Sequence, residues 1–511
     1  QAGRWESAAH GSFTVEETTR EGRGTDVVLH LKTDDEIDDF LREWTLRDLV
    51  RKYSDYVRHP IRLRTEKTED GETTVEWEQV NSGSALWTRP KGAITDEQAN
   101  DFYRHLTRDW EKTLARAHFK TEGLQSLTGL LFVPRRSPMD LYMSRDRGVR
   151  LFVKRVFIMD DCEELLPDYL RFVRGVVDSD DLPLNVSREF LQKDRTTAGI
   201  RKQVVRHVLR LLEELADEEE AERAAAAGET AGADSSAEQA SDAGAEESDG
   251  STGRYTTFWT QFGRLLKEGV HSDAANRDKL AGLLRYETSH GGGLQSLAAI
   301  AGRAKAGQDA LYYIVAPSRA AAASAPHVEA LRSRGYEVVY MTDPIDEWVV
   351  DALGEFEGKR FVSASKGALE LPDSDEERKE LEERSESLAG LVGRVKDVLA
   401  SDVEDVRVTT RLTDSPACLV VPEGGIAPHV ERLLRAQNAD LPQQKRILEI
   451  NPRHPVVARL NTLAEDAERG EEVAEWSRLL YDQALVAEGS PPSDPAGFAR
   501  RITNLLTRAL G

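Results

Sequence analysis

One polar loop holds the residues best suited to chemistry. A strand-like run ends near Asp178, and the chain then enters a helix for which Ser187 is a good N-cap. Arg188 therefore falls in the first turn, where a cation opposes the helix dipole by ~0.3 to 1 kcal/mol unless an anion lies close. A phosphate would remove this conflict, because helix N–H groups and a guanidinium both bind phosphate. Asn185 and Gln192 could orient the same group, so the loop favours a phosphate-facing arginine.

A structural role is the alternative for this arginine. Arg188 could pair with Asp180, Asp181 or Glu189 and merely fix the loop. The local spacing leaves both interpretations open, and the ion pair is the simpler of the two.

Complete catalytic signatures are absent from the sequence. It contains no G-x-x-x-x-G-K-[ST] phosphate loop, no G-x-S-x-G nucleophile elbow and no H-E-x-x-H metal helix. The 11 histidines are scattered, and Cys162 and Cys418 are the only cysteines, so neither a metal site nor a disulfide framework is expected. Two isolated cysteines are typical of a reducing cytoplasm. Any catalysis is expected to need residues beyond this chain.

The composition predicts a soluble protein of several domains. Its 511 residues exceed the ~250 to 300 at which single hydrophobic cores stop growing. Hydrophobic residues make up 39% and charged residues 31%, and no run approaches the ~18 apolar residues needed to cross a bilayer. The net charge of -23 repels nucleic acid phosphates. We therefore expect a cytoplasmic protein that binds neither membranes nor nucleic acid.

Strand-like and helix-like segments alternate along the chain, which indicates α/β modules. The β-formers of Ser12–Glu16 and Thr25–Leu31 predict two strands of a hairpin or of a sheet edge, and the charged segment Arg62–Glu78 resembles a linker. Ala224–Gly253 contains no Val, Ile, Leu, aromatic residue, Lys or Arg, so a disordered insertion is expected there. Further strands are predicted at 311–315, 338–341 and 447–450, and amphipathic helices at 471–488 and 495–510.

Two apolar stripes are candidates for binding other proteins. Ile426, Val430, Leu433 and Leu434 follow the spacing i, i+4, i+7 and i+8 of one helix face. Trp348 shares a second helical stripe with smaller apolar neighbours. Packing in an ordinary core explains both patterns, so the residues alone assign them no function.

Two neighbouring segments, Tyr169–Asp178 (YLRFVRGVVD) and Asp181–Glu189 (DLPLNVSRE), resemble the signature of the ninety-kilodalton heat-shock chaperones, the Hsp90 family. This match is long and specific. Other segments also resemble the family, and those from residue 255 onward resemble its bacterial branch. Together the matches extend over nearly the whole chain. They are 46–55 (LRDLVRKYSD), 85–89 (ALWTR), 156–161 (VFIMDD), 255–269, 346–348 (DEW), 411–417 (RLTDSPA) and 482–485 (DQAL).

The resemblance implies an α/β multidomain fold built of α+β modules. Its expected parts are a remnant of an N-terminal ATPase sheet, a two-part α/β middle domain and an α+β C-terminal dimerisation domain. The expected boundaries are 1–64 for the end of the ATPase domain, 65–80 for a charged linker, 81–215 for the large middle subdomain, 216–253 for the acidic disordered insertion, 254–372 for the small middle subdomain, 373–386 for a charged boundary and 387–511 for the C-terminal domain.

The resemblance also implies ATP, with Mg2+, as a cofactor bound mainly by a domain that precedes this chain. Arg188 matches the family's arginine for the γ-phosphate of ATP, with Asn185 and Gln192 beside it in the catalytic loop. The intact protein is therefore expected to be an ATPase, and this chain alone is expected to be inactive.

The family's client-binding surfaces match Glu347 and Trp348 and the helix that carries the Ile426 to Leu434 stripe. Unfolded or partly folded client proteins are thus the expected partners, together with a second copy of the chain and other chaperones. The stripes at 471–488 and 495–510 fit an intrachain bundle or a dimer, and the resemblance favours a homodimer. The alternative is a passive dimeric binding scaffold without ATPase activity, for which a phosphate-facing arginine would have no use.

Overall fold

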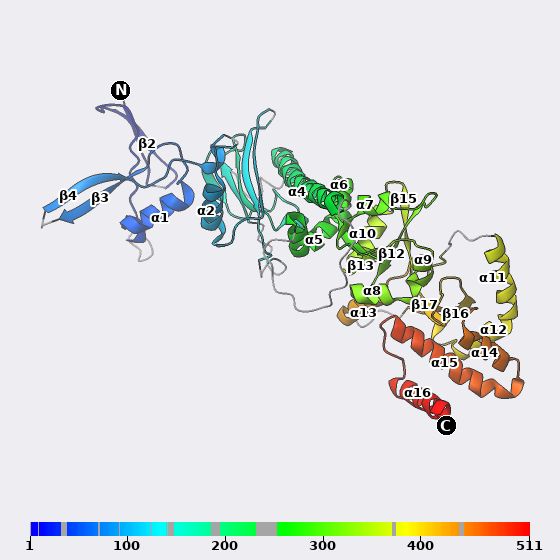
Figure 1. Ribbon diagram of the computed structural model, residues 1–511. Helices are drawn as coiled ribbons and strands as arrows, with labels where there is room; N and C mark the ends of the chain where they lie inside the picture. The colour runs from blue at the N-terminus through cyan, green and yellow to red at the C-terminus, as the bar shows by residue number, and fades with distance from the viewer. Residues whose placement is uncertain are drawn as a thin grey trace. The chain divides into compact units, whose positions relative to one another are not determined.

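The computed structural model of the chain divides into two compact units, Gln1–Ala85 with Arg155–Phe157, and Leu86–Lys154 with Ile158–Gly511. Figure 1 traces the elements of both units along the chain. The structure describes residues 2–8, 10–31, 38–69, 72–90, 92–123, 125–138, 141, 148–184, 195–230, 253–369, 375–438 and 444–510.

The described part of the first unit contains two antiparallel strand pairs, the helix α1 and a 3-10 helix, η1 (Asp38–Leu41). Strands β1 (Ala2–Glu6) and β2 (Thr14–Thr18) pair antiparallel, helix α1 spans Glu43–Tyr53, and β3 (Arg62–Glu69) pairs with β4 (Glu72–Gln79). The prediction of a strand at Thr25–Leu31 is wrong, because the partner of β2 is β1 and precedes it in the chain.

The range expected to be a charged linker, 65–80, contains most of the β3–β4 hairpin. Threonines alternate with charged residues there, and Val75 and Trp77 add further β-formers, so strand pairing outweighs the charge. The linker expectation is therefore corrected to a two-stranded ribbon over the described part of this range.

The second unit begins with a five-stranded mixed sheet of order β5-β6-β9-β7-β8, in which β7 and β9 run parallel. Figure 1 shows helices α2 and α4 on opposite sides of this sheet. The buried Trp87 packs against Phe102 and Phe152, and its indole N–H donates to the carboxylate of Asp178 over 2.9 Å. The bounds of these elements are β5 Ala115–Thr121, β6 Leu127–Val133, β7 Val149–Val153, β8 Val156–Met159, β9 Arg174–Ser179, η2 Leu86–Thr88 and α2 Asp96–Thr107.

A long helix, α4 (Arg195–Thr230), leads from this sheet to α5 (Arg254–Ser272) and α6 (Arg277–Leu283). Residues 216–230, for which the sequence predicted disorder, are helical because alanine and glutamate are strong helix formers. Glu219 on α4 is buried and accepts hydrogen bonds from the backbone N–H and the hydroxyl of Thr256 on α5. The remainder of the expected insertion, 231–252, lies outside the described residues.

A second sheet of six strands has the order β11-β10-β13-β12-β15-β14. Its central strands β12 (Ala310–Val315), β13 (Val338–Met341) and β15 (Lys359–Ser363) run parallel, which confirms the strands predicted at 311–315 and 338–341. The remaining elements are β10 Arg285–Thr288, β11 Gln295–Ser296, β14 Glu355–Phe356, α7 Leu297–Gly302, α8 Arg319–Ser324, η4 Pro326–Val328, α9 Glu329–Ser333 and α10 Asp346–Leu353.

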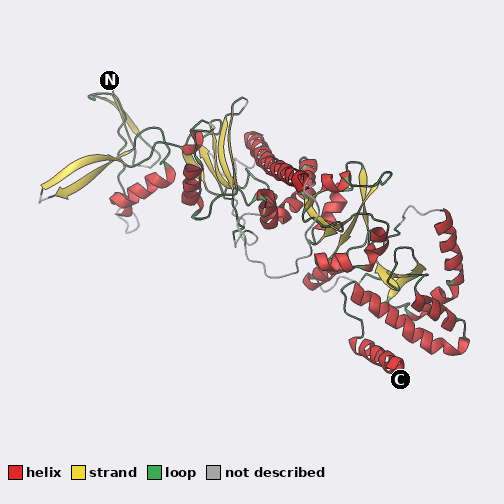
Figure 2. Cartoon of the chain, viewed as in Figure 1, coloured by secondary structure: helices red, strands yellow, loops and turns green. Residues whose placement is uncertain are grey.

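A three-stranded sheet of order β16-β18-β17 follows, covered by helices that pack on a separate core. Figure 2 shows the alternation of strands and helices along the chain, as expected for a multidomain α/β protein. The elements are α11 Asp375–Ser387, α12 Ala389–Val398, β16 Val403–Val408, β17 Ala417–Val420, α13 Pro428–Gln437, β18 Arg446–Ile450, α14 Pro455–Ala464, η5 Ala467–Arg469, α15 Gly470–Ala487 and α16 Pro495–Leu510.

Candidate functional site

The predicted phosphate-facing residues Asn185, Arg188 and Gln192 lie outside the described residues. The strand that leads to them is firmly anchored. Asp178 binds the indole of Trp87, and the carboxylate of Asp181 accepts a hydrogen bond from the backbone N–H of Ser126 over 2.6 Å. Asp181 is thus already engaged by the sheet that precedes the loop.

Glu347, the second residue of α10, is a buried carboxylate with a partner on each oxygen. Its side chain forms an ion pair with the ammonium group of Lys366, and its other oxygen accepts a hydrogen bond from the backbone N–H of Ala427 over 3.0 Å. Glu347 is only 5% exposed, so its carboxylate faces protein on all sides. The next residue, Trp348, is 39% exposed.

Lys366 joins the end of the six-stranded sheet to the C-terminal sheet. It lies in a segment that forms a parallel bridge with Val421, where the backbone N–H of Val421 donates to Ser365 and that of Gly367 donates to Val421. The chain then passes from Val421 through a short loop to Ala427, where Glu347 holds it again. The Glu347–Lys366 pair therefore fixes both ends of the loop that introduces α13.

Helix α13 begins without a side-chain cap of its own. Its N-cap residue is Ala427, which has no polar side chain, and Pro428 follows in the first turn. In a capping box, a Glu or Gln at the third helical position binds the backbone N–H of the N-cap residue. That position in α13 is Val430, and Glu347 of α10 makes the equivalent bond from outside the helix. A carboxylate at this end also favours the helix dipole.

The structure separates the predicted stripe of four apolar residues into two groups. Val430 is 1% exposed and Leu434 packs against the hydrophobic core. Ile426, which precedes α13, is 38% exposed and Leu433 is 49% exposed. Only Ile426 and Leu433 therefore offer substantial apolar surface, in addition to Trp348.

A hollow of about 400 Å³ lies next to this surface, between α13 and the carboxyl ends of β12 and β13. Ligands of α/β sheets bind most often at the carboxyl ends of the strands. Burial, together with the nearby Arg432 guanidinium, lowers the pKa of His429 to about 4, so its imidazole is neutral. The lining residues are Pro317, Thr342, Pro344, His429, Arg432 and Leu433.

A buried ionic network also joins the six-stranded sheet to the three-stranded sheet. Arg411 pairs with Glu449 over 3.0 Å and donates to the carbonyl oxygens of Ala364 and Gly367. Arg407 binds the other oxygen of Glu449 over 2.6 Å. No local pattern in the sequence points to this network, although Arg411 opens the RLTDSPA segment that carries the family resemblance.

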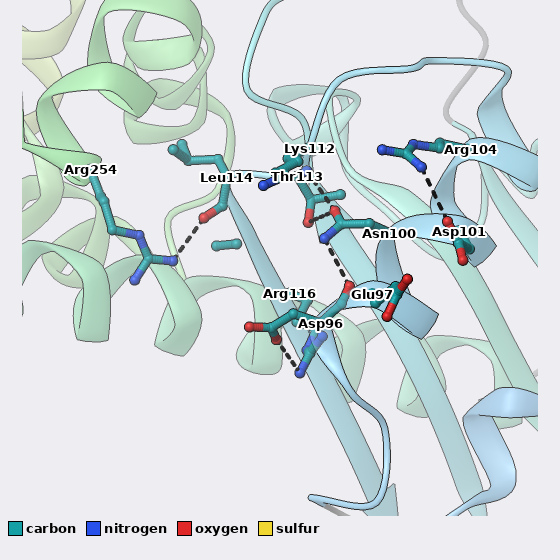
Figure 3. Close-up of a pocket in the computed structure, with 11 residues that line it drawn as sticks. Asp96, Glu97, Asn100, Asp101, Arg104, Lys112, Thr113, Leu114, Arg116 and Arg254 are labelled. Atoms are coloured by element: carbon teal, nitrogen blue, oxygen red, sulfur yellow. Dashed lines mark hydrogen bonds and ion pairs between the residues drawn. The ribbon is translucent and has the colours of Figure 1, made fainter. Parts of the chain in front are cut away.

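A further hollow of about 520 Å³ lies between α2 and β5 (Figure 3). Most of its charged groups are already engaged: Arg116 pairs with Asp96 over 2.8 Å, Arg104 with Asp101 over 3.1 Å, and Arg254 donates to the carbonyl of Leu114 over 2.7 Å. We therefore assign this hollow no ligand.

The described residues offer neither a metal site nor a membrane-spanning helix. Those residues contain no group of three or more His, Cys, Asp or Glu side chains that could hold a metal ion. Among the helices within the described ranges, none is both long and apolar enough to span a membrane.

Comparison with known proteins gives consistent matches. The family model "Hsp90 protein" matches residues 70–511. The chaperone protein HtpG of Myxococcus xanthus is 51% identical over 513 residues, which cover 99% of this chain and 73% of that protein. The HtpG proteins of Bordetella pertussis and Geobacter sulfurreducens are 46% and 43% identical and are covered over 76% and 75% of their lengths. The chain therefore belongs to the Hsp90 family and is of the bacterial HtpG type.

Proposed function

We propose that the protein is an ATP-dependent molecular chaperone that binds unfolded or partly folded proteins at an apolar surface formed by Trp348, Ile426 and Leu433. The HtpG relatives support a chaperone function in general. The proposal adds a client surface, a role for ATP and a dimeric clamp.

The hydrogen bond between Glu347 and Ala427 carries the assignment of the client surface. It links the residue before Trp348 to the residue after Ile426, although 80 positions separate its two partners in the sequence. Two candidate surfaces that the sequence offered separately therefore adjoin one another. Large apolar side chains that remain exposed at such a junction are typical of protein-binding sites.

A double variant that removes two of the exposed apolar side chains tests this surface by its affinity for a client protein. Trp348→Ala combined with Leu433→Ser should weaken binding of a permanently unfolded protein, such as fluorescently labelled carboxymethylated α-lactalbumin, by about tenfold or more, since hot-spot residues each contribute over ~1 kcal/mol. Val456→Ser is the matched control, because Val456 is similarly exposed on α14. An unchanged dissociation constant for the double variant would exclude this surface.

ATP is proposed to act through Arg188, with Asn185 and Gln192 beside it. The support is the resemblance of 181–189 to the family signature and the chemical fit of a guanidinium to a γ-phosphate. In a protein that also contains the preceding nucleotide-binding region, Arg188→Ala should lower the rate of ATP hydrolysis by ~10³-fold or more. Arg150→Ala, which removes an arginine paired with Asp160, is the control. Unchanged hydrolysis in Arg188→Ala would return Arg188 to a structural ion pair, whereas a wild-type protein that does not hydrolyse ATP would favour the passive scaffold.

The protein is further proposed to be a homodimer that uses α15 and α16. Helix α16 contacts α15, and Arg501 on α16 pairs with Asp482 on α15. Leu506 on α16 remains exposed. Four-helix bundles form when such apolar faces from two helix pairs come together.

A further inference from the structure

We propose that Glu347 is a positioning residue. Its bonds to Lys366 and Ala427 hold helix α13 in place for contact with the client, and Glu347 itself does not touch the client. This inference rests on the proposed client surface. It assigns different roles to two adjacent residues of α10, with Trp348 as the contact and Glu347 as the support.

Burial separates the two roles. Glu347 is 5% exposed and both of its oxygens are engaged within the protein, whereas Trp348 is 39% exposed. A client could reach the carboxylate only by displacing Lys366 or Ala427. Because charged groups are costly to leave unpaired in the interior, such an exchange is unfavourable.

The two bonds of Glu347 act on the loop before α13. Lys366 is held beside Val421, where the loop begins, and Ala427 ends the loop as the N-cap of α13. A second contact holds the residue before Ala427, where the side-chain oxygen of Gln444 accepts a hydrogen bond from the backbone N–H of Ile426 over 3.2 Å. The position of Ile426 therefore depends on Gln444 as well as on Glu347, and the start of the helix that carries Leu433 depends on Glu347.

Loss of either partner should have the same consequence. Without Lys366, the Glu347 carboxylate would be buried without a counter-ion, and without Glu347 the backbone N–H of Ala427 would be buried without an acceptor. In both cases the N-terminus of α13 should detach more often. Helix α13 contributes Val430 to the core, so detachment would also open that part of the core.

Client affinity and hydrogen exchange, measured on the full chain, test this inference together. Lys366→Met should weaken binding of labelled carboxymethylated α-lactalbumin by about tenfold and should accelerate amide exchange in α13. Lys366→Arg retains the charge and should stay within about twofold of the wild type in both measurements. Trp348→Ala should weaken binding and leave exchange in α13 unchanged. Lys396→Met breaks an exposed ion pair with Asp405 and is the control for loss of a lysine.

The outcomes distinguish the positioning role of Glu347 from the client surface itself. Normal affinity and normal exchange in Lys366→Met, together with lost affinity in Glu347→Ala, would overturn the positioning role and would make Glu347 a direct contact. Normal affinity in both Trp348→Ala and Leu433→Ser would overturn the client surface instead, while exchange in α13 would still report whether Lys366 and Glu347 hold the helix. If Lys366→Met does not fold, Glu347→Gln tests the same point. It retains an acceptor for Ala427 and should show intermediate exchange.

Discussion

Arg411 and Glu449 form a buried ion pair that joins two sheets of the second unit. The carboxylate of Glu449 on β18 binds Arg411 over 3.0 Å, and Arg411 in turn donates to carbonyl oxygens of the segment that follows β15. Both side chains are almost fully buried. The pair is therefore a rigid joint between the six-stranded and the three-stranded sheets.

Replacing Arg411 by Met should destabilise this joint by ~3 to 5 kcal/mol. The substitution leaves buried carbonyl oxygens without donors and removes one of the two cations that neutralise the Glu449 carboxylate. Native-state hydrogen exchange of β18 would measure the loss. Lys396→Met breaks an exposed pair over 2.7 Å and should leave hydrogen exchange of β18 close to that of the wild type, because solvent screens exposed ion pairs. Equal effects of the two substitutions would show that Arg411 contributes no more than a surface charge.

The sequence predicted best those strands that are continuous and apolar. Val338–Met341 and the strand ending at Val315 are buried over their whole lengths, so the signal of their β-branched residues is strong. The strand that contains Val75 and Trp77 falls in a range predicted to be a linker, because alternating charged residues conceal a ribbon strand whose residues 74–79 are exposed.

The candidate site was predicted only in part, since its contacts are distant in the sequence. The sequence predicts Trp348, Leu433 and Glu347 as client contacts; Trp348 and Leu433 are exposed, whereas Glu347 is buried. Its actual partners are 19 and 80 residues away, and no local pattern reveals them. The helical spacing also grouped Val430 with Leu433, because a spacing shows which residues share a face and not which part of that face the core covers.

The buried imidazole of His327 should make the folded protein less stable in mild acid. Its Nε2–H donates to the carbonyl of Leu419 over 2.6 Å, and its buried Nδ1 has no partner among the described residues. Burial, followed by the charge of Arg411, lowers the pKa of His327 to about 4 from 6.5, while Glu449 and Glu329 oppose this shift.

Because the folded pKa of His327 lies below the unfolded value, the unfolded state binds the proton more readily between these two values. The contribution of neutral His327 is therefore complete above pH ~6.5 and should fall by ~2 kcal/mol at pH 5. Urea unfolding at pH 7.5 and pH 5 would measure this fall. His327→Gln retains an N–H donor and should lower the pH dependence by that amount; the same dependence in both proteins would contradict the assignment.

The segment 231–252 should be dispensable for folding. Its two flanks are held by Glu219, which binds Thr256, and by Arg223, which binds both Glu219 and the hydroxyl of Thr256. Replacing 231–252 by a flexible linker of about ten residues should change the free energy of unfolding by less than ~1 kcal/mol, the scale of loop-closure entropy. Glu219→Ala should cost ~1 to 3 kcal/mol, because buried donors lose their acceptor. A larger loss on replacing the segment than in Glu219→Ala would show that the segment itself contributes to the core.

The exposed Leu506 provides a test of the proposed homodimer. Helix α16 is amphipathic, and its residues Ile502 and Leu505 are half-buried whereas Leu506 is exposed. A carboxylate introduced by Leu506→Glu would lose its hydration in a dimer bundle and would remain solvated in a monomer. Light scattering at micromolar concentration should therefore give twice the chain mass for the wild type and the single-chain mass for Leu506→Glu. Arg500→Glu, six residues away on another face of α16, should remain dimeric. A wild-type protein at the single-chain mass, or a dimeric Leu506→Glu, would exclude this helix as the dimer contact.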